Sequence, residues 1–339
     1  MKNAVSVTGL VPADRIGRTL PHEHLFATMT YAYPASGEEA YRPITIDRLG
    51  EIRSDLMTNA NNIHLDSSCG QALELKKAAD AGIDTLVELT TEPIGRNPER
   101  MVEVSEFTGV NVISGTGQYL AHHQRPWALQ ASREELAELM IRELTEGIGD
   151  TGIRTGVVGE IGLFEPVRPA ELKVLEAAVL AQRATGAPLW VHLMNVPVVD
   201  DALAVFDEYE PIYEKTAFCH MDFDIRDLTR HERAMDRGIS VEFDFFGSVW
   251  LPVDHYIHCP TDPQRLAVLA DWSERGYADR VLISHDVCTR VQFTSHGGYG
   301  YAYIPTIVPG LMDQMGIARE LLDIWMIDTP RRLLAWADS

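Results

Sequence analysis

The chain has 339 residues, of which 45% are hydrophobic and 23% are charged, a composition typical of a soluble globular protein. Its 29 basic and 50 acidic residues give a net charge of −21. This acidity disfavours a nucleic-acid or anionic-membrane partner and favours a small-molecule substrate. The length suits one α/β barrel domain that spans residues 1–339.

The N-terminal segment and the cysteines indicate the compartment. The first residues lack a sustained apolar stretch of the signal-peptide kind, and no apolar run approaches the roughly 18 residues of a membrane span. We therefore expect a cytoplasmic protein. The four cysteines, Cys69, Cys219, Cys259 and Cys288, lie far apart without a C-x-x-C pair, which predicts reduced thiols and neither disulfides nor a zinc knuckle.

In chain order, the sequence repeats one unit: a helical stretch, a glycine, and a short apolar run with β-strand character. Asn97 followed by Pro98 predicts the start of one helix, and Gly109 predicts its end. Ser132 and Glu135 have the spacing of a capping box at the start of the next. The expected strands lie in residues 18–24, 85–89, 110–114, 155–162, 188–193, 215–220, 239–245 and 281–286.

Eight strands that alternate with helices predict a parallel sheet closed into a (β/α)8 TIM barrel with long loops at its C-terminal face. An open doubly wound sheet is the rival fold, but no G-x-G-x-x-G follows the first strand. Residues 31–66 and 287–311 interrupt the repeat and are predicted to be active-site loops, although a solvated insertion fits the first equally well. The tail from Met312 to Trp336 predicts two closing helices.

Ligand-type side chains gather where the predicted strands end. Residues two apart in a strand face the same way, so His22 and His24 are expected to point into one site. In a barrel, all strands bring their carboxyl ends to one mouth. The side chains at these ends are His22, His24, Glu160, His192, His220 and Asp286.

Because burying six such groups unpaired would be costly, the pattern predicts a metal site. Four imidazoles and two carboxylates can hold two divalent ions if one carboxylate bridges them. This set of nitrogen and oxygen ligands fits zinc, our first choice, and also Mn, Co or Fe. Cys219 precedes His220 and is expected to point out of the barrel if the strand stays regular.

The motifs LPHEHL, VVGEIG, WVHL, CHMD, SHD and GGYGY occur in this order along nearly the whole chain. With them, the chain resembles the phosphotriesterase-related branch of the amidohydrolase superfamily. The resemblance implies a (β/α)8 barrel with a binuclear metal centre, and hydrolysis by a hydroxide that bridges the two ions. It also implies that His22, His24 and Asp286 hold the more buried ion, and that His192 and His220 hold the more exposed one.

The resemblance places Glu160 at the bridging position. The phosphotriesterases proper have a carboxylated lysine there, whereas VVGEIG contains no lysine and Lys173 lies in the following predicted helix. The glutamate form occurs in related lactonase-like members. The departure therefore disfavours organophosphate hydrolysis and leaves the expected metal site intact.

The resemblance also suggests roles beyond the ligands. Asp286 would take a proton from the attacking hydroxide and deliver it to the leaving group, and Tyr119 matches a family tyrosine near the substrate oxygen. At the position of Phe245, the acyl-homoserine-lactonase members have an arginine, so a polar contact for that substrate is missing. Arg290 would bind a carboxylate or phosphate, with a structural salt bridge as its alternative, and Trp250 would add to the substrate pocket.

Several functions fit these residues. The first is a lactonase or carboxylic ester hydrolase acting on an uncharged or singly anionic lactone with an apolar portion. The second is an amidohydrolase of an N-acyl amino compound, and a promiscuous organophosphate triesterase is a further alternative. A non-catalytic metal-binding protein is disfavoured because it would not need Asp286 as a proton shuttle. A homodimer is expected, since homodimers are common among the proteins that the chain resembles.

Overall fold

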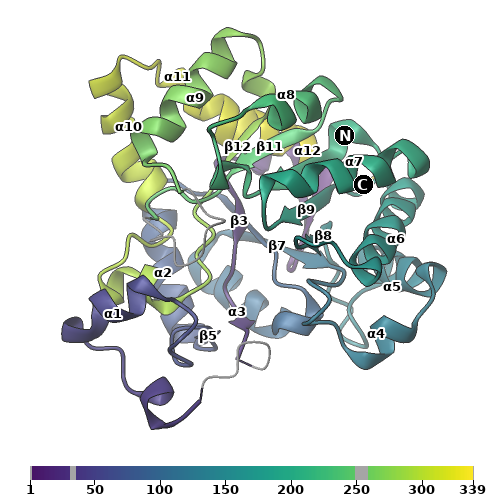
Figure 1. Cartoon of the computed structure of the whole chain (residues 1–339), viewed down its shortest axis with the longest axis horizontal. Coiled ribbons are helices and arrows are strands. Elements are labelled where there is room, and N and C mark those ends of the chain that lie inside the picture. The colour runs from purple at the N-terminus through teal and green to yellow at the C-terminus, as the bar shows by residue number, and fades with distance from the viewer. Residues whose placement is uncertain (1, 31–35, 249–258, 339) are drawn as a thin grey trace.

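The computed structural model describes residues 2–30, 36–248 and 259–338, which form a barrel of parallel strands surrounded by helices (Figure 1). Eight strands, from β3 to β12, lie side by side in the sheet in the same order as in the chain. Their bounds are β3 Thr19–Glu23, β6 Thr85–Glu88, β7 Asn111–Thr116, β8 Val157–Leu163, β9 Leu189–Leu193, β10 Thr216–Cys219, β11 Ser240–Phe243 and β12 Val281–Ile283. The predicted (β/α)8 barrel is thereby confirmed.

The first and last strands meet through hydrogen bonds that nearly close the barrel. The amide of Asp286 donates to the carbonyl oxygen of His22 at 3.3 Å. The amide of His22 donates to Ser284 Oγ at 3.1 Å. Because every strand is parallel to its neighbours, the carboxyl ends of all eight lie at one mouth.

The helices begin and end where their capping residues lie. The Asn97 side chain accepts a hydrogen bond from the amide of Arg100, Gly109 ends that helix in the left-handed conformation, and Ser132 with Glu135 forms a capping box. The main helices are α2 Ser68–Asp80, α3 Pro98–Thr108, α4 Pro126–Gln130, α5 Arg133–Thr145, α6 Pro169–Thr185, α7 Val199–Tyr209, α8 Thr229–Asp236, α9 Asp262–Glu274 and α10 Tyr303–Met315. No helix in the described ranges has both the length and the apolarity that a membrane crossing requires.

Two apolar layers support the barrel. The larger lies between the strands and the surrounding helices. The smaller fills the barrel itself, where Val87, Ile113, Val157, Trp190 and Leu282 are at most 1% exposed. This packed interior leaves the polar chemistry to the mouth.

The two ends of the chain lie together, as Figure 1 shows. The hairpin of β1 (Asn3–Ser6) and β2 (Gly9–Pro12) precedes the barrel, and the amide of Asn3 donates to the carbonyl of Ala337 at 2.8 Å. Apolar side chains of both ends join the cluster inside the barrel. The sequence analysis did not anticipate this hairpin.

The segment after β12 is helical from Tyr303 onward, so only the part before this residue is a connecting segment. Ile304, Val308 and Met312 are buried at intervals of four residues, which is why this stretch forms α10. A second helical run follows, through α11 Glu320–Asp323, a π-helical turn at Ile324–Asp328 and α12 Thr329–Leu334. Within residues 36–66 the structure has α1 (Leu49–Ser54), and β5 (His64–Leu65) pairs with β4 (Ala27–Thr28).

Candidate metal centre

One cluster of predicted ligands joins the first strand of the barrel to the last. His22 lies in β3 and His24 directly follows it, with 5.5 Å between the ring centroids. Asp286 follows β12 by three residues, and its Oδ1 lies 3.2 Å from His24 Nε2 and 3.9 Å from His22 Nε2. All three side chains are buried, so the fold brings these residues into one enclosed group.

A second cluster lies on the neighbouring strands β8 to β10. His192 Nδ1 is 2.7 Å from Glu160 Oε2 and 2.6 Å from His220 Nε2. Glu160 also reaches the first cluster, since its Oε1 is 3.5 Å from His24 Nε2 and its Oε2 is 3.6 Å from His22 Nε2. The Glu160 carboxylate therefore lies between the clusters, and all six predicted ligand residues meet at one place.

Two features of these donor atoms fit bound cations. His22 Nε2 is fully buried and has no hydrogen-bond partner among the described residues, which is unfavourable unless a cation accepts its lone pair. His192 Nδ1 and His220 Nε2 face each other beside Glu160 and converge on a single point. Imidazole nitrogens and carboxylate oxygens in this number suit two divalent ions of the Zn, Mn, Co or Fe type.

For three of the six predicted ligands, the surroundings favour the protonation state that a metal ligand needs. Burial would raise the pKa of Glu160, but His192, His22 and His24 outweigh it and lower the pKa to about 2. Burial lowers the pKa of His192 to about 4, although Glu160 acts in the opposite direction. For Asp286, the hydrogen bond with His24 and the charge of His22 overcome burial and lower the pKa. At neutral pH the two acids are carboxylates and His192 is neutral.

Buried carboxylates hold two of the imidazoles from behind. His220 Nδ1 lies 2.9 Å from Asp244 Oδ1, and His22 Nδ1 lies 3.1 Å from Asp244 Oδ2 and 3.3 Å from Glu242 Oε2. Burial would raise the pKa of Asp244, but His220 and His22 hold it well below its usual range. With each Nδ1 donating to a carboxylate, each Nε2 is left to bind a cation.

The ring of His24 is held in a similar way by Glu88 at the end of the neighbouring strand β6 and by Thr90 just after it. His24 Nδ1 pairs with Thr90 Oγ1 at 2.8 Å, and this hydroxyl donates to Glu88 Oε1 at 2.7 Å. Glu88 also accepts hydrogen bonds from the amides of Leu25 and Phe26. These contacts fix the ring of His24 and the chain that follows it.

A buried ion pair positions the end of β11. Asp222 Oδ2 accepts from Arg265 Nε at 2.5 Å, and the two Asp222 oxygens accept from the amides of Asp244 and Phe245 at 3.2 Å each. Arg265 Nη1 also donates to Asp262 at 2.7 Å. The pair thus holds the backbone that presents Asp244 to His220.

The sequence did not lead us to predict Glu242, Asp244 and Arg265 as parts of the site. A signal for the first two is present in VEFDF, where two acids occupy alternate positions of an otherwise apolar strand. Alternate positions face the same side, and here that side is the barrel interior. No comparable signal marks Arg265, because its role depends on the packing of α9 against the barrel.

The expected orientation of Cys219 is wrong, because its side chain points into the barrel. Its Sγ lies with donor atoms of His22, Glu242 and Asp244 in a group no more than 4.8 Å across, and the side chain belongs to the inner apolar cluster. The cause is that β10 ends at Cys219 and His220 has a φ of +58°. Regular alternation stops at that residue, so neighbouring side chains both face inward.

His220 and Asp286 share an unusual backbone conformation. Three non-glycine residues in the described ranges have positive φ, and two of them are His220 at +58° and Asp286 at +48°. The left-handed region is unfavourable for a residue with a Cβ, and such strain persists where the surrounding structure imposes it. It is imposed here at two predicted metal ligands.

Two of the predicted substrate-contacting residues lie against the metal centre. The Tyr119 hydroxyl is 3.2 Å from His192 Nε2 and 3.4 Å from His192 Nδ1, and the tyrosine is 6% exposed. The ring of Phe245 stacks on His220 with 5.1 Å between centroids. Both side chains therefore border the position of the more exposed predicted ion.

The other two predicted substrate contacts have different outcomes. Arg290 donates to Asp66 at 2.8 Å and to the carbonyl of His64 at 2.8 Å, so it ties the segment after β12 to β5 and its following residue. This salt bridge is the structural alternative given for Arg290 from the sequence. Trp250 lies outside the described residues.

A (β/α)8 barrel with imidazoles and carboxylates gathered at the carboxyl ends of its strands defines the protein as a metal-dependent hydrolase. Comparison with known proteins is more specific. The chain belongs to the phosphotriesterase family, whose model matches residues 3–334. The resemblance found in the sequence motifs is therefore confirmed.

Individual relatives span nearly the whole chain. A phosphotriesterase-related protein of Nematostella vectensis is 32% identical over 347 residues, covering 98% of each chain. The N-acetyltaurine hydrolase of Homo sapiens is 32% identical over 346 residues, covering 98% of this chain and 97% of the relative.

Solved structures also match the fold over nearly the whole chain. A resiniferatoxin-binding protein from Rhodobacter sphaeroides has a TM-score of 0.94 and 32% identity, covering 98% of this chain and 94% of that one. A variant of a PTE-like lactonase from Deinococcus radiodurans has a TM-score of 0.77 and 26% identity, covering 98% and 99%. The family thus includes relatives named for amide hydrolysis, lactone hydrolysis and ligand binding.

Proposed function

We propose that this protein uses two divalent metal ions to hydrolyse the amide bond of a small N-acyl amino compound, with a lactone or ester as the second candidate substrate. The observation that carries the metal chemistry is the Glu160 carboxylate between two clusters of buried ligands. The amide is placed first because the human N-acetyltaurine hydrolase is 32% identical, whereas the lactonase variant is 26% identical. This reverses the order of substrates that the sequence alone favoured.

The ligand roles follow the two clusters. In this proposal His22, His24 and Asp286 would hold the more buried ion, His192 and His220 would hold the more exposed one, and Glu160 would serve both. When bound, two such ions would lower the pKa of a bound water to about 7 and polarise the substrate carbonyl. Zinc is the first metal to test, followed by Mn, Co and Fe.

Asp286 is the proposed proton carrier. Its lowered pKa keeps it ionised at neutral pH, so it is able to accept a proton from the attacking water. The same proton can then pass to the nitrogen of the leaving amine. An amide needs this step more than an ester does, because an unprotonated amine anion is a poor leaving group.

Tyr119 and Phe245 complete the proposed site. The Tyr119 hydroxyl, next to His192, is placed to donate a hydrogen bond to the substrate carbonyl oxygen as negative charge develops on it. Phe245 packs on the ring of His220 and keeps that side of the site apolar. It offers no polar contact of the kind expected for an acyl-homoserine lactone.

A substrate panel tests this proposal. Protein loaded with zinc, and separately with Mn or Co, is assayed against N-acetyltaurine, N-acetyl amino acids, lactones, aryl esters and a phosphotriester, with and without a chelator. We expect amide cleavage that the chelator abolishes. Lactone or ester cleavage without amide cleavage would support the second candidate, and phosphotriester cleavage alone would support the organophosphate alternative.

The binding-protein alternative is supported by the resiniferatoxin-binding protein among the similar structures. It predicts that the protein binds metal and small molecules without turnover. If protein with two bound ions cleaves nothing in the panel, the proposed substrate classes are wrong.

A further inference from the structure

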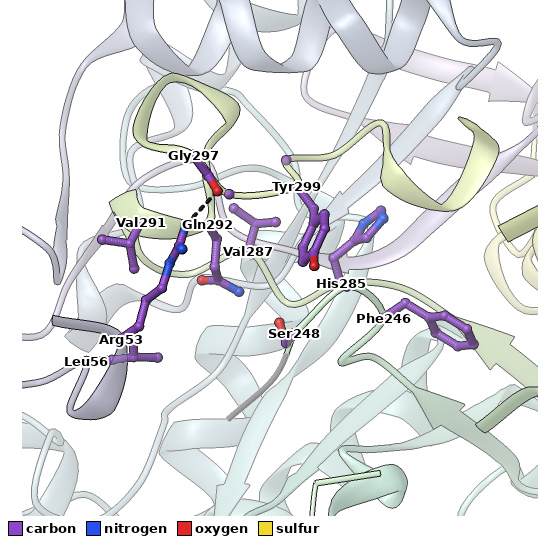
Figure 2. A pocket seen from close by; sticks show the side chains of 13 residues that line it. Arg53, Leu56, Phe246, Ser248, His285, Val287, Val291, Gln292, Gly297 and Tyr299 are labelled. Carbon is purple, nitrogen blue, oxygen red and sulfur yellow. Dashed lines mark hydrogen bonds between the residues drawn. The ribbon is translucent and has the colours of Figure 1, made fainter. Parts of the chain in front are cut away.

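A cavity of about 310 Å³ lies at the C-terminal face of the barrel, within the size range of small-molecule sites (Figure 2). Three segments line it: residues 246–248 after β11, residues between His285 and Gly300 after β12, and Arg53 with Leu56 at the end of α1. Figure 2 shows Arg53 on one side of the cavity and Tyr299, His285 and Phe246 on the other.

The cavity adjoins the metal centre through the chain on either side of Asp286. His285 and Val287 both line it. Gln292 lines it too and donates a hydrogen bond from Nε2 to the carbonyl of Asp286 at 2.9 Å. A substrate with its scissile bond at the metal centre would have to extend past Asp286 to enter this space.

The lining carries one permanently charged side chain, the Arg53 guanidinium, and no described lining residue is an acid. Arg53 donates from Nη2 to the carbonyl of Gly297 at 2.5 Å and forms no ion pair with any described residue. Other cations nearby are neutralised. Arg48 pairs with Glu51, and Arg290 pairs with Asp66.

Besides Arg53, the described lining consists of backbone, apolar side chains and the polar side chains of Ser248, His285, Gln292 and Tyr299. Phe246, Val287 and Val291 present hydrocarbon to the cavity. Gly298 brings the backbone close, because a Cβ there would lie 2.1 Å from the backbone carbon and oxygen of Gln292. A complementary ligand has a short hydrocarbon spacer that ends in one anionic group.

We propose that this cavity binds the part of the substrate beyond the scissile bond, and that Arg53 pairs with its anionic group. The substrate class is then an N-acyl amino acid or an N-acyl aminosulfonate, because two oxygens of either a carboxylate or a sulfonate can accept hydrogen bonds from one guanidinium. In a protein of net charge −21, an unpaired arginine is the local feature that permits such an anion to bind. The substrate class named here rests on the proposed amide hydrolysis, whereas the cavity and its single arginine are independent of that proposal.

The test uses non-hydrolysable ligands so that binding is separated from turnover. In 5-oxohexanoate and 4-oxopentane-1-sulfonate, a CH₂ group replaces the amide nitrogen of N-acetyl-β-alanine and N-acetyltaurine. The uncharged comparison is 5-oxohexanamide. Dissociation constants are measured by ligand-detected NMR titration on the zinc-loaded protein and on its Arg53→Gln, Arg53→Lys and Arg42→Gln variants.

We expect the unmodified protein to bind at least one anion about tenfold more tightly than the amide, as for one charge-assisted hydrogen-bonded pair. Arg53→Gln should abolish this preference and Arg53→Lys should retain part of it. Arg42→Gln is the matched control, because it removes the same charge from an exposed arginine that pairs with Glu39. The tighter of the two anions identifies the substrate head group.

A preference that persists in Arg53→Gln, or is absent from the unmodified protein, overturns the proposal. If the binding results are as expected but no N-acyl compound is hydrolysed, the anion site stands and the proposed amide hydrolysis fails. If N-acyl compounds are hydrolysed while Arg53→Gln leaves the KM for the anionic substrate unchanged, the hydrolysis stands and the anion site fails.

Discussion

The metal centre and the cavity beside it share one mouth of the barrel but are built differently. The six predicted ligands lie on strands or within three residues of a strand end, and all are buried. The cavity is lined by loops and by a short helix from distant parts of the chain. Strand ends are fixed by the hydrogen-bonded sheet, whereas loops depend on fewer contacts. Under the two proposals above, the strands would carry the reaction and the loops would select the substrate.

The largest expected effect comes from Asp286→Asn. Removing the proton carrier should lower kcat about 10³-fold for every substrate, within the usual range for general acid–base groups, while much of the metal stays bound. The measurement is kcat together with metal content. Asp313→Asn, which changes an exposed carboxylate paired with Arg319, is the control. Normal turnover by Asp286→Asn would show that the proton-shuttle assignment is wrong.

Glu242→Gln tests the support behind the first cluster. The carboxylate at 3.3 Å from His22 Nδ1 becomes an amide, so the ring is held less firmly and metal affinity should fall about 10- to 100-fold. Competition with a chelator of known affinity measures the change. The exposed Glu138→Gln is the control, and equal affinities in the two variants would contradict a supporting role for Glu242.

Metal binding should strengthen as the pH rises. Without metal, burial lowers the pKa of His24, but the interactions with Asp286 and Glu160 outweigh burial, so the pKa is raised. Burial also acts to lower the pKa of His22, but Cys219, Asp244 and Glu242 outweigh it and raise the pKa. A raised pKa means that metal must displace a proton, so apparent affinity should increase about tenfold per pH unit for each proton displaced.

The same shifts have an opposite consequence for the metal-free fold. A histidine whose pKa is raised on folding stabilises the fold fully below its unfolded pKa of about 6.5, and this contribution is lost as pH rises through the folded value.

Calorimetric titration of metal in buffers of different ionisation enthalpy measures the protons that metal binding releases. Affinity that is independent of pH above about 6.5 would contradict the expected proton release.

Gly298→Ala tests the loop side of the comparison. The added Cβ would meet the backbone of Gln292 at 2.1 Å, so the cavity wall must move. We expect a loss of about 1–3 kcal/mol in the free energy of unfolding and a higher KM, with metal content unchanged. Gly310→Ala is the control, since nothing lies within 4 Å of its added Cβ in α10. Lost metal in Gly298→Ala would mean that the two regions are not separable.

The smallest effect is expected from Tyr119→Phe. Removing one hydroxyl that would donate to the developing charge should lower kcat about tenfold, the lower end of the cost of a hydrogen bond to a charged group, and leave KM and metal content near their original values. Steady-state kinetics with metal analysis measures this. An unchanged kcat would leave Tyr119 as a packing neighbour of His192.

The sequence was sufficient for most of the fold because its signals are local. The caps at Asn97 and Ser132 and the stop at Gly109 act within a few residues, and the structure has helix ends at these places. The hairpin at Asn3–Pro12 was missed because its pairing with the rest of the molecule involves Ala337, at the other end of the chain. Local patterns do not report such a contact.

The gathering of the six predicted ligands was also predictable, since residues at the carboxyl ends of parallel strands must share one mouth. The orientation of Cys219 was not, because it depends on the left-handed turn at His220, which the packing around Asp244 and Asp222 holds in place. The Arg290 side chain was given two possible roles, and its partner Asp66 belongs to a segment whose path the sequence did not reveal.

The sequence by itself therefore determined the order of strands and helices, the barrel, and which side chains reach its mouth. The physical reason is that hydrophobic periodicity and capping encode these features over short distances. Only the tertiary structure decided which carboxylates stand behind the imidazoles and which loops enclose the cavity. It alone placed Arg53, from α1, against Gly297, more than two hundred residues away, because loop paths are fixed by long-range contacts that no local pattern encodes.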